Sequence, residues 1–306
     1  GFFQSRISYI IIYLVCFIPL LRLIKTLKPD YFISHLITSL PLTIMNLFKF
    51  NTKFILRISG MPKLNFIRKN FWKLISSRIF IVTCPSLELK SKLRNMNLFE
   101  ESKLHFLPDA IIDINKFKIQ SKEETHVLQK FEKKRIIFSA GRLTKQKNFT
   151  YLIDEFCLFS QTNKDFVLLI LGDGEEKNVL EKKIKEKNLE EKVFLIGHVK
   201  NVYKFFKKGE IFVLSSLWEE VGFVMVEAAL SNLFVISSNC PNGPSEFLEN
   251  GQNGILFQNN KFGELTKSLK KYLNIENKKK HKYEVKKSTM KYSRFRHFIE
   301  LEKTLK

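Results

Sequence analysis

The chain has 306 residues and a hydrophobic content of 44%, which is enough for two ordinary domains with real cores. Its formal net charge is +22 and its pI is near 9.7, which favours nucleic acid, an anionic membrane or phosphorylated ligands as partners. The charge is spread along a chain rich in Lys, Asn, Ile and Phe, so a general bias from AT-rich coding explains it more readily than nucleic-acid binding. The four cysteines and six histidines lack C-x-x-C and H-x-x-x-H spacing, which argues against a zinc site or disulfide framework and favours a reducing cytosol.

The first predicted element is an uncharged run over residues 7–21, bounded by Arg6 and Arg22. A membrane-spanning helix needs about 20 apolar residues, so the run is short unless residues 23–24 are counted with it. No small-residue cleavage site of a signal peptide follows. A buried or membrane-touching helix is therefore predicted, with a true span as the alternative. The chain begins with Gly1 and not with Met, and it starts inside what looks like an element, so the sequence is expected to be a fragment.

After a break at residues 28–30, short apolar runs alternate with helical patterns. Strands are predicted over 31–34, 53–58, 78–83 and 104–107, and helices over 41–48 and 87–98. This alternation implies parallel βαβ units. A doubly wound domain usually has about six strands, so residues 1–115 are predicted to form an incomplete N-terminal Rossmann-like domain. Residues 116–132 are polar and weakly periodic, which predicts a linker with a short helix.

Residues 133–260 carry the clearest α/β pattern. Strands are predicted over 135–139, 166–171, 193–196, 211–214, 233–237 and 254–257, and helices near 149–160, 175–187, 201–207, 224–231 and 244–249. Five βα steps in this length predict a complete Rossmann-like unit. Residues 261–306 are lysine-rich and predicted to be helical, and the last helix is expected to pack back toward the N-terminal domain.

Two carboxylates bracket the turn after the fourth strand of this second domain. Glu219 lies in the predicted loop, and Glu227 lies in the first turn or so of the following helix. Ligands of open α/β sheets bind outside the carboxyl ends of the strands, and a helix N-terminus attracts an anion. A glutamate near a helix N-terminus is often only a partner of the helix dipole, so the pair alone does not define a site.

A basic loop follows the first strand of the same domain and reads G-R-L-T-K-Q-K-N. Gly141 permits a sharp turn, and Arg142 and Lys147 are placed to reach an anion above the strand end. Arg offers a planar fork to phosphate and Lys a point charge. Such cations stabilise the negative charge that builds on a diphosphate leaving group. In so lysine-rich a chain, a solvated basic loop is the alternative.

Three segments together carry a family resemblance. S-x-W-E-x-x-G-F-x-x-x-E-A from residue 216 and G-R-L-x-x-Q-K-N-F from residue 141 resemble the nucleotide-sugar site of retaining glycosyltransferases with the GT-B fold, family four or group 1. N-G-P-x-E-x-L over residues 242–248 resembles the branch that builds lipopolysaccharide, capsule or lipid-linked oligosaccharides. The resemblance is strong over 134–257 and weak over 28–114.

The resemblance implies a GT-B fold, with two Rossmann-like domains facing a cleft, and a role for each residue of these motifs. Arg142 and Lys147 would hold the two phosphates and stabilise the leaving group, and Glu219 would bind a hydroxyl of the transferred sugar. Glu227 would bind the ribose hydroxyls. Backbone close to the donor would come from five further positions: Gly141, Val199, Gly222, Phe223 and Val224.

The first domain departs from the family pattern. K-P-D-Y-F-I-S-H resembles the strand that ends in a histidine, so His35 is a candidate for the cleft, with a packed histidine as the more favoured alternative. Many relatives carry a second histidine that touches the donor sugar, and Arg57 or Ser59 stands in that region here. The Gly-rich loop after the family's first strand is missing, which puts the activity of this chain by itself in question.

The resemblance therefore predicts a glycosyltransferase that moves a sugar from a nucleotide diphosphate sugar, most often UDP-linked, to a glycan or lipid-linked acceptor. It implies retention of configuration and a role in cell-surface polysaccharide or lipopolysaccharide synthesis. It implies no metal and no cofactor, and no D-x-D motif is present. The apolar run and basic surface favour peripheral contact with anionic lipids at the cytoplasmic face of the inner membrane, and no nucleic-acid partner is expected.

Other functions stay open. A glycosidase uses paired carboxylates, but it has no diphosphate for Arg142 and Lys147 to hold. Another GT-B enzyme, such as a nucleotide-sugar epimerase or a phosphorylase, is possible in principle, although no lysine context for pyridoxal phosphate is found. The last alternative is a non-enzymatic basic protein that binds membrane or nucleic acid, which the lack of aromatic-basic RNA motifs and of helix-turn-helix spacing disfavours.

Overall fold

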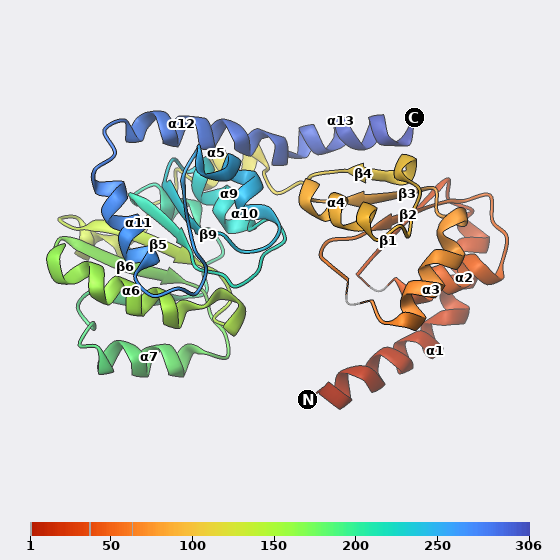
Figure 1. The fold of residues 1–306 in the computed structure, drawn as a ribbon, viewed down its shortest axis with the longest axis horizontal. Helices are drawn as coiled ribbons and strands as arrows, with labels where there is room; N and C mark the ends of the chain where they lie inside the picture. The colour runs from red at the N-terminus through yellow and green to blue at the C-terminus, as the bar shows by residue number, and fades with distance from the viewer. Residues whose placement is uncertain (1, 37, 63) are drawn as a thin grey trace. The chain divides into compact units, whose positions relative to one another are not determined.

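The computed structural model describes residues 2–36, 38–62 and 64–306. Gly1, on which the expectation of a fragment partly rested, lies outside the described residues. The chain forms two compact units, residues 1–107 and 108–306, and each contains one sheet with helices packed on it (Figure 1).

The first unit is built on a four-stranded parallel sheet in the order β1-β2-β3-β4. Its strands are β1 (Tyr31–His35), β2 (Lys53–Arg57), β3 (Ile81–Cys84) and β4 (Leu104–Phe106), and its helices are α1 (Phe2–Leu27), α2 (Ser39–Leu47), α3 (Phe66–Ile75) and α4 (Leu87–Asn95). The predicted strands and helices are confirmed, although β3 begins three residues later than predicted and α1 extends beyond the predicted run.

Helix α3 was not predicted. Its local signals are an Asn65 side chain that accepts a hydrogen bond from the Arg68 N–H over 2.8 Å and two buried residues, Trp72 and Ile75, spaced three apart on one face. An asparagine cap and an apolar pair at this spacing both favour a helix. Exposed apolar residues on the other sides of the helix, such as Phe66 and Leu74, hide so short a buried face from a periodicity scan.

The second unit is built on a six-stranded parallel sheet in the order β10-β9-β8-β5-β6-β7. Its strands are β5 (Arg135–Ala140), β6 (Phe166–Leu171), β7 (Val193–Gly197), β8 (Ile211–Leu214), β9 (Phe234–Ser238) and β10 (Ile255–Phe257). Between them run α6 (Phe149–Thr162), α7 (Lys177–Glu186), α8 (Tyr203–Phe206), α9 (Phe223–Leu230) and α10 (Gly243–Phe247). All six strands are confirmed to within one residue of their predicted bounds.

The central strands of this sheet are buried on both faces. Along β5, Ile136, Phe138 and Ala140 enter one apolar core, and Ile137 enters the other. Side chains of a strand alternate between faces, so an unbroken apolar run supplies both cores at once. One core contains residues of α8 and α9, and the other contains residues of α6 and α7. Helices on both faces hold the sheet rigid and leave its loops at the edge.

The unit boundary lies at Pro108, and the segment predicted as a linker belongs to the second unit. Residues 116–132 include most of α5 (Ile114–Gln120) and a 3-10 helix (His126–Phe131). Leu128 and Phe131 of this helix are buried in the core of the second unit. The predicted short helix is present, but the segment belongs to the second unit and is not a linker, because a few widely spaced apolar residues anchor a stretch whose average composition is polar.

The C-terminal segment forms α11 (Glu264–Leu273), α12 (Lys278–Ser288) and α13 (Arg294–Leu305). The start of α11 is fixed by Glu155, a fully buried residue of α6. Its carboxylate accepts hydrogen bonds from the Gly263 N–H over 2.6 Å and the Thr266 N–H over 2.8 Å. A carboxylate at a helix N-terminus satisfies free N–H groups and meets the positive end of the dipole. The packing of α13 toward the first domain stays a prediction.

Candidate functional site

The strand order of the second unit reverses between β5 and β8. The chain runs from β5 outward to β6 and β7, then returns to the other side of β5 to form β8. Loops that leave such a switch point diverge to opposite faces of the sheet, and ligands of open α/β sheets bind there. The basic loop follows β5 and the Glu219 loop follows β8, so both sequence motifs flank the switch point.

Lys147 and Glu219 form an ion pair that joins these two loops. Lys147 Nζ contacts Glu219 Oε1, and the Ser216 hydroxyl donates a hydrogen bond to the same oxygen over 2.6 Å. The side chains of Lys147 and Glu219 are only 15% and 8% exposed. With so little water available, each charge depends on the other for solvation. The sequence predicted both residues for the site but did not predict this contact.

Hydrogen bonds to backbone carbonyls hold the two loops together around this pair. The Ser215 hydroxyl donates to the Lys147 carbonyl over 2.7 Å. The Leu217 N–H donates to the Gln146 carbonyl over 2.8 Å, and the Gln146 side-chain amide donates to the Trp218 carbonyl, also over 2.8 Å. The ion pair is therefore part of a fixed framework rather than a contact between free side chains.

The loop after β9 supports Glu219 from the other side. The Asn242 side-chain amide is buried and donates to the Glu219 carbonyl over 3.0 Å. At Gly243, an added Cβ would lie 2.3 Å from Val221 Cα, so only glycine fits between the two loops. The sequence indicated a turn at Asn242-Gly243 but gave no sign that the Asn242 side chain positions Glu219.

The loop after β6 approaches the basic loop just as closely. The Gly141 N–H donates to the Leu171 carbonyl at the end of β6 over 2.9 Å. An added Cβ at Gly172 would lie 1.9 Å from the Gly141 carbonyl oxygen, and its φ of +147° disfavours a side chain. This contact fixes the backbone of Gly141, which was predicted for the donor site.

Gly141 in turn positions Lys147, whereas Arg142 is exposed. An added Cβ at Gly141 would lie 2.8 Å from Lys147 Cε, so the lysine stem passes directly over the glycine. The Arg142 side chain extends into solvent. One predicted phosphate ligand is thus held in place, and the other has an exposed side chain.

The Glu227 carboxylate is stabilised less by its neighbours than the Glu219 carboxylate is. It is on α9, and the Tyr203 hydroxyl donates to its Oε1 over 3.4 Å. The Phe117 ring packs edge-on against Tyr203 with 5.0 Å between ring centroids. Burial raises the pKa of Glu227 above the ordinary value of a glutamate, and the Tyr203 hydrogen bond only partly opposes this rise. Sequence reasoning missed Tyr203 and Phe117, because they come from α8 and α5.

The remaining predicted positions lie around the start of α9 and after β7. Gly222 precedes the helix with a φ of +78°, and Phe223 begins it with its side chain half exposed. Val224 and Val199 are partly buried against the core, which leaves their backbone for ligand contact. Trp218, also half exposed, is an aromatic side chain at this edge that was not assigned a role.

In the first unit, two of the candidate residues lie together at the carboxyl ends of β1 and β2. His35 is exposed, and its Nε2 is in hydrogen-bond contact with the Ser59 hydroxyl. The alternative of a packed histidine is therefore wrong. Arg57 is buried, and its Nη1 donates to the Leu107 carbonyl over 2.7 Å. Arg57 thus holds the end of the sheet together, and Ser59 stays the candidate in that region.

Metal-binding groups are not gathered in the described part of the chain: no three His, Cys, Asp or Glu side chains lie where they could hold an ion. The four cysteines are all free thiols. Burial raises the pKa of Cys240, close to Glu219, to about 11, so this thiol stays protonated at neutral pH.

Comparison with known proteins agrees with this geometry. Residues 120–289, more than half of the chain, match the family model described as glycosyl transferases group 1. The chain belongs to this family. The match includes the loops after β5, β6, β7, β8 and β9, and therefore all the site positions predicted in the second unit.

Two curated relatives illustrate the match. An uncharacterized glycosyltransferase of Methanocaldococcus jannaschii is 33% identical over 245 residues, which cover 75% of this chain and 60% of that protein. The N-acetylgalactosamine-N,N'-diacetylbacillosaminyl-diphospho-undecaprenol 4-alpha-N-acetylgalactosaminyltransferase of Campylobacter jejuni is 27% identical over 231 residues, covering 72% of this chain and 60% of that protein. The chain thus spans about 60% of the length of these relatives.

Among solved structures, Anabaena HepE in complex with UDP and glucose superposes with a TM-score of 0.78 at 16% identity. The superposition covers 94% of this chain and 81% of HepE. The predicted family and the predicted GT-B fold class, with its parallel α/β units, are confirmed.

The Lys147–Glu219 pair can be tested by a double-mutant cycle. Lys147→Met and Glu219→Gln should each lower the free energy of unfolding by about 3–5 kcal/mol, because each leaves a buried polar group without its partner. The double variant should cost less than the sum by about 1–3 kcal/mol, measured by urea denaturation. The exposed Lys182–Glu186 pair of α7 is the control and should show a coupling below about 0.5 kcal/mol. Additive losses at Lys147 and Glu219 would contradict the pairing.

The close approach of the loops predicts a large penalty at Gly172. Gly172→Ala should lower the free energy of unfolding by about 2–4 kcal/mol, because it adds a steric clash to an unfavourable φ. Gly197→Ala is the matched control: its φ is +87°, but the space around it is open, so only about 1 kcal/mol should be lost. Equal losses in the two variants would show that the loops do not meet as described.

The raised pKa of Glu227 predicts a pH-dependent stability. Its contribution is fully present below the unfolded-state pKa of glutamate, near 4.3, and is lost as pH rises through the higher folded-state pKa. Glu227→Gln removes this loss, so its melting temperature should exceed that of the wild type by a larger margin at neutral pH than at about pH 4. Glu181→Gln on the exposed side of α7 should show the same margin at both pH values. A constant margin for Glu227→Gln would disprove the assignment.

Proposed function

We propose that this chain transfers a sugar from a nucleotide diphosphate sugar to a glycan or lipid-linked acceptor, with retention of configuration. The observation that carries the proposal is the Lys147–Glu219 pair at the switch point, where a cation suited to phosphate adjoins a carboxylate suited to sugar hydroxyls. Membership of the glycosyl transferases group 1 family supports the class of reaction. UDP is proposed as the nucleotide because HepE, of the same fold, is described in complex with UDP and glucose.

Donor binding would redistribute the contacts of Lys147. In the structure, Glu219 neutralises the lysine. A diphosphate carries more negative charge than one carboxylate, so it would attract Lys147 Nζ and the exposed Arg142 at the same time. Glu219 would then be left free to accept hydrogen bonds from the sugar. Because the lysine stem is fixed over Gly141, this exchange needs only a small movement of the ammonium group.

The start of α9 would add to the phosphate site. The first N–H groups of a helix have no partner within the helix and lie at the positive end of its dipole. Together with Arg142 and Lys147 they would stabilise the charge on the leaving diphosphate without a metal ion or cofactor. We therefore propose a metal-independent reaction that relies on protein cations.

Glu227 would bind the ribose of the donor. Its carboxylate is buried and, among the residues that the structure describes, receives one long hydrogen bond, from Tyr203. Two ribose hydroxyls would supply the hydrogen bonds that burial has removed, and they would favour the ionised form. The energy lost by burying the charge in the free protein would thus be recovered when the correct ligand binds.

We further propose an acceptor carried on a lipid at the cytoplasmic face of the inner membrane, within cell-surface polysaccharide or lipopolysaccharide synthesis. The name of the Campylobacter jejuni relative includes a diphospho-undecaprenol carrier. The exposed apolar helix α1 supports a membrane-associated protein. The positive charge is spread along the chain, and no nucleic-acid partner is proposed.

Calorimetric titration with UDP, GDP and ADP tests the donor site. UDP should bind, and Arg142→Ala and Glu227→Ala should each weaken binding by about 10- to 100-fold, as expected for the loss of a hydrogen bond to a charged group. Lys145→Ala, an exposed lysine of the same loop, is the matched control and should bind UDP as the wild type does. A non-enzymatic basic protein would bind no nucleotide selectively and would be insensitive to both site substitutions.

A further inference from the structure

Helix α1 is apolar on all sides and exposed. Tyr9, Ile10, Ile11 and Ile12 point in four directions about 100° apart around the helix. Six apolar side chains of this stretch are at least half exposed: Tyr9, Ile10, Ile11, Leu14, Val15 and Ile18. In Figure 1 this part of α1 extends beyond the other elements of the first unit. A helix without a polar face is stable in an apolar environment rather than in water.

The dimensions of α1 fit a lipid bilayer. Residues 8–27 have a mean hydropathy of 2.2, and only 11% of the residues in the apolar stretch are buried within the protein. A core helix of similar composition would be mostly buried. Residues 8–20, which precede the end that packs on the first unit, measure about 20 Å as a helix, which is long enough to reach deep into the hydrocarbon of a bilayer, about 30 Å thick. The absence of a polar face distinguishes α1 from a surface-lying amphipathic helix.

The far end of α1 is fixed to the first unit and is basic. Leu21 and Ile24 are buried in its core, while Arg22, Lys25 and Lys28 are exposed on the same turns. Basic residues at the end of an apolar helix lie at the level of the lipid headgroups, where their long stems remain in apolar surroundings. This end of α1 therefore marks the position of the membrane surface on the first unit.

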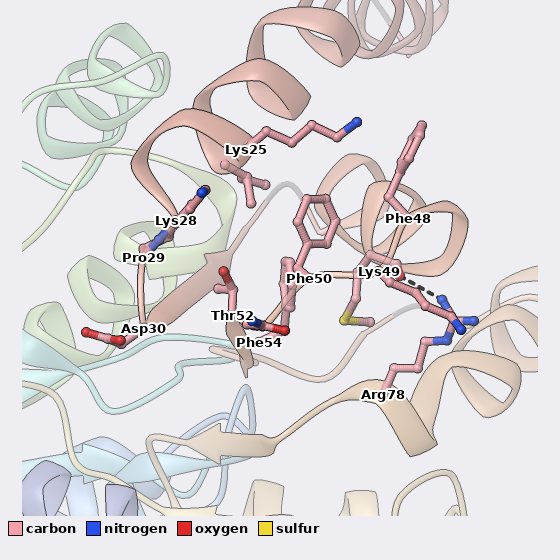
Figure 2. A pocket seen from close by; sticks show the side chains of 13 residues that line it. Lys25, Lys28, Pro29, Asp30, Phe48, Lys49, Phe50, Thr52, Phe54 and Arg78 are labelled. Atoms are coloured by element: carbon pink, nitrogen blue, oxygen red, sulfur yellow. Dashed lines mark hydrogen bonds between the residues drawn. The ribbon is translucent and has the colours of Figure 1, made fainter.

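A cavity of about 870 Å³ opens at this position (Figure 2). It is named the α1 basic cavity, and its charged lining consists of four cations and one carboxylate: Lys25, Lys28, Lys49, Arg78 and Asp30. Figure 2 shows Lys25 and Lys28 on the side of α1, and Lys49 and Arg78 on the opposite side. The volume lies in the range of ligand pockets, and the lining carries a net positive charge.

The cations of the cavity differ in how firmly they are held. Arg78 Nη1 donates to the Met45 and Asn46 carbonyls over 2.9 and 2.6 Å, so it forms part of the wall. Lys25 Nζ lies 4.9 Å from the centre of the Phe48 ring, and Lys49 is exposed. The cavity therefore combines movable ammonium groups, which suit a phosphate, with an aromatic wall, which suits an acyl or glycerol chain.

The cavity is separate from the predicted acceptor residues of the same unit. Its lining residues 28–30 precede β1, and its lining residues 48–52 precede β2. It thus lies at the amino ends of these strands, whereas His35 is the last residue of β1 and Ser59 follows the carboxyl end of β2. A ligand in this cavity would hold the protein at the membrane without occupying the edge of the sheet that carries the candidate chemistry.

We propose that the α1 basic cavity binds the phosphate headgroup of an anionic phospholipid while α1 is embedded in the bilayer. The apolar helix inserts into any bilayer, and the cavity makes the protein bind an anionic bilayer more tightly than a neutral one. The inference rests on the membrane association included in the proposed function, but not on the identity of the donor or on the transfer reaction.

Vesicle flotation of the full chain tests this proposal, with phosphatidylcholine vesicles that contain or lack phosphatidylglycerol. The wild type should bind both and prefer the anionic ones. Lys25→Gln/Lys28→Gln/Lys49→Gln should lose this preference, on the order of 100-fold in affinity since each lysine near an anionic surface contributes about fivefold. Its binding to phosphatidylcholine should be unchanged. Arg78 is left in place because it supports the fold.

The matched control is Lys279→Gln/Lys280→Gln/Lys287→Gln on α12, which removes the same charge from exposed positions of the second unit. It should keep the anionic preference, and an equal loss in both triple variants would overturn the cavity assignment.

Ile11→Asp/Val15→Asp should abolish binding to both kinds of vesicle, and unchanged binding would overturn the embedding of α1. Loss of the anionic preference in excess inorganic phosphate would assign the cavity to a soluble phosphate instead. All these variants should bind UDP as the wild type does, which separates this test from that of the donor site.

Discussion

The buried ion pair between Lys147 and Glu219 is the interaction on which the geometry of the candidate site depends. The two residues are 72 positions apart in the chain, but β5 and β8 are neighbours in the sheet. Neither charge is well hydrated, so each loop is held in the conformation that brings its residue to the other. The geometry of the site is therefore set by contacts within the protein, and a site held in this way lowers the ordering cost of ligand binding.

The loops reach this arrangement because glycine allows their backbones to touch. Gly172 lies against Gly141, and Gly243 lies against Val221, so the loops after four different strands form one continuous edge. Lys147 lies over this edge with its stem fixed. A cation held by packed backbone can respond to a diphosphate with a small displacement, and such preorganisation is the main source of electrostatic stabilisation in enzyme sites.

The two glutamates of the site have different environments, and this difference matches the different roles proposed for them. Glu219 is satisfied by a lysine and by the Ser216 hydroxyl, so it can exchange one partner for another. Glu227 is buried with little compensation, which raises its pKa and favours a ligand that brings hydroxyl donors. In the first unit, the apolar surface of α1 adjoins the cations of the α1 basic cavity. Apolar and cationic groups adjoin in the same way where a protein meets a membrane surface.

The sequence alone determined the strands of the second unit and the loops that carry the site, because buried parallel strands are continuously apolar and their turns have characteristic residues. It also indicated the family, through motifs within single loops. The tertiary structure decided which side chains meet. The Lys147–Glu219 contact follows from strand order, the burial of Arg57 from its hydrogen bond to the segment after β4 of the same sheet, and the packing of residues 116–132 from a few distant apolar contacts. Local patterns record periodicity and turn chemistry, but contacts between distant segments depend on topology, which no local pattern contains.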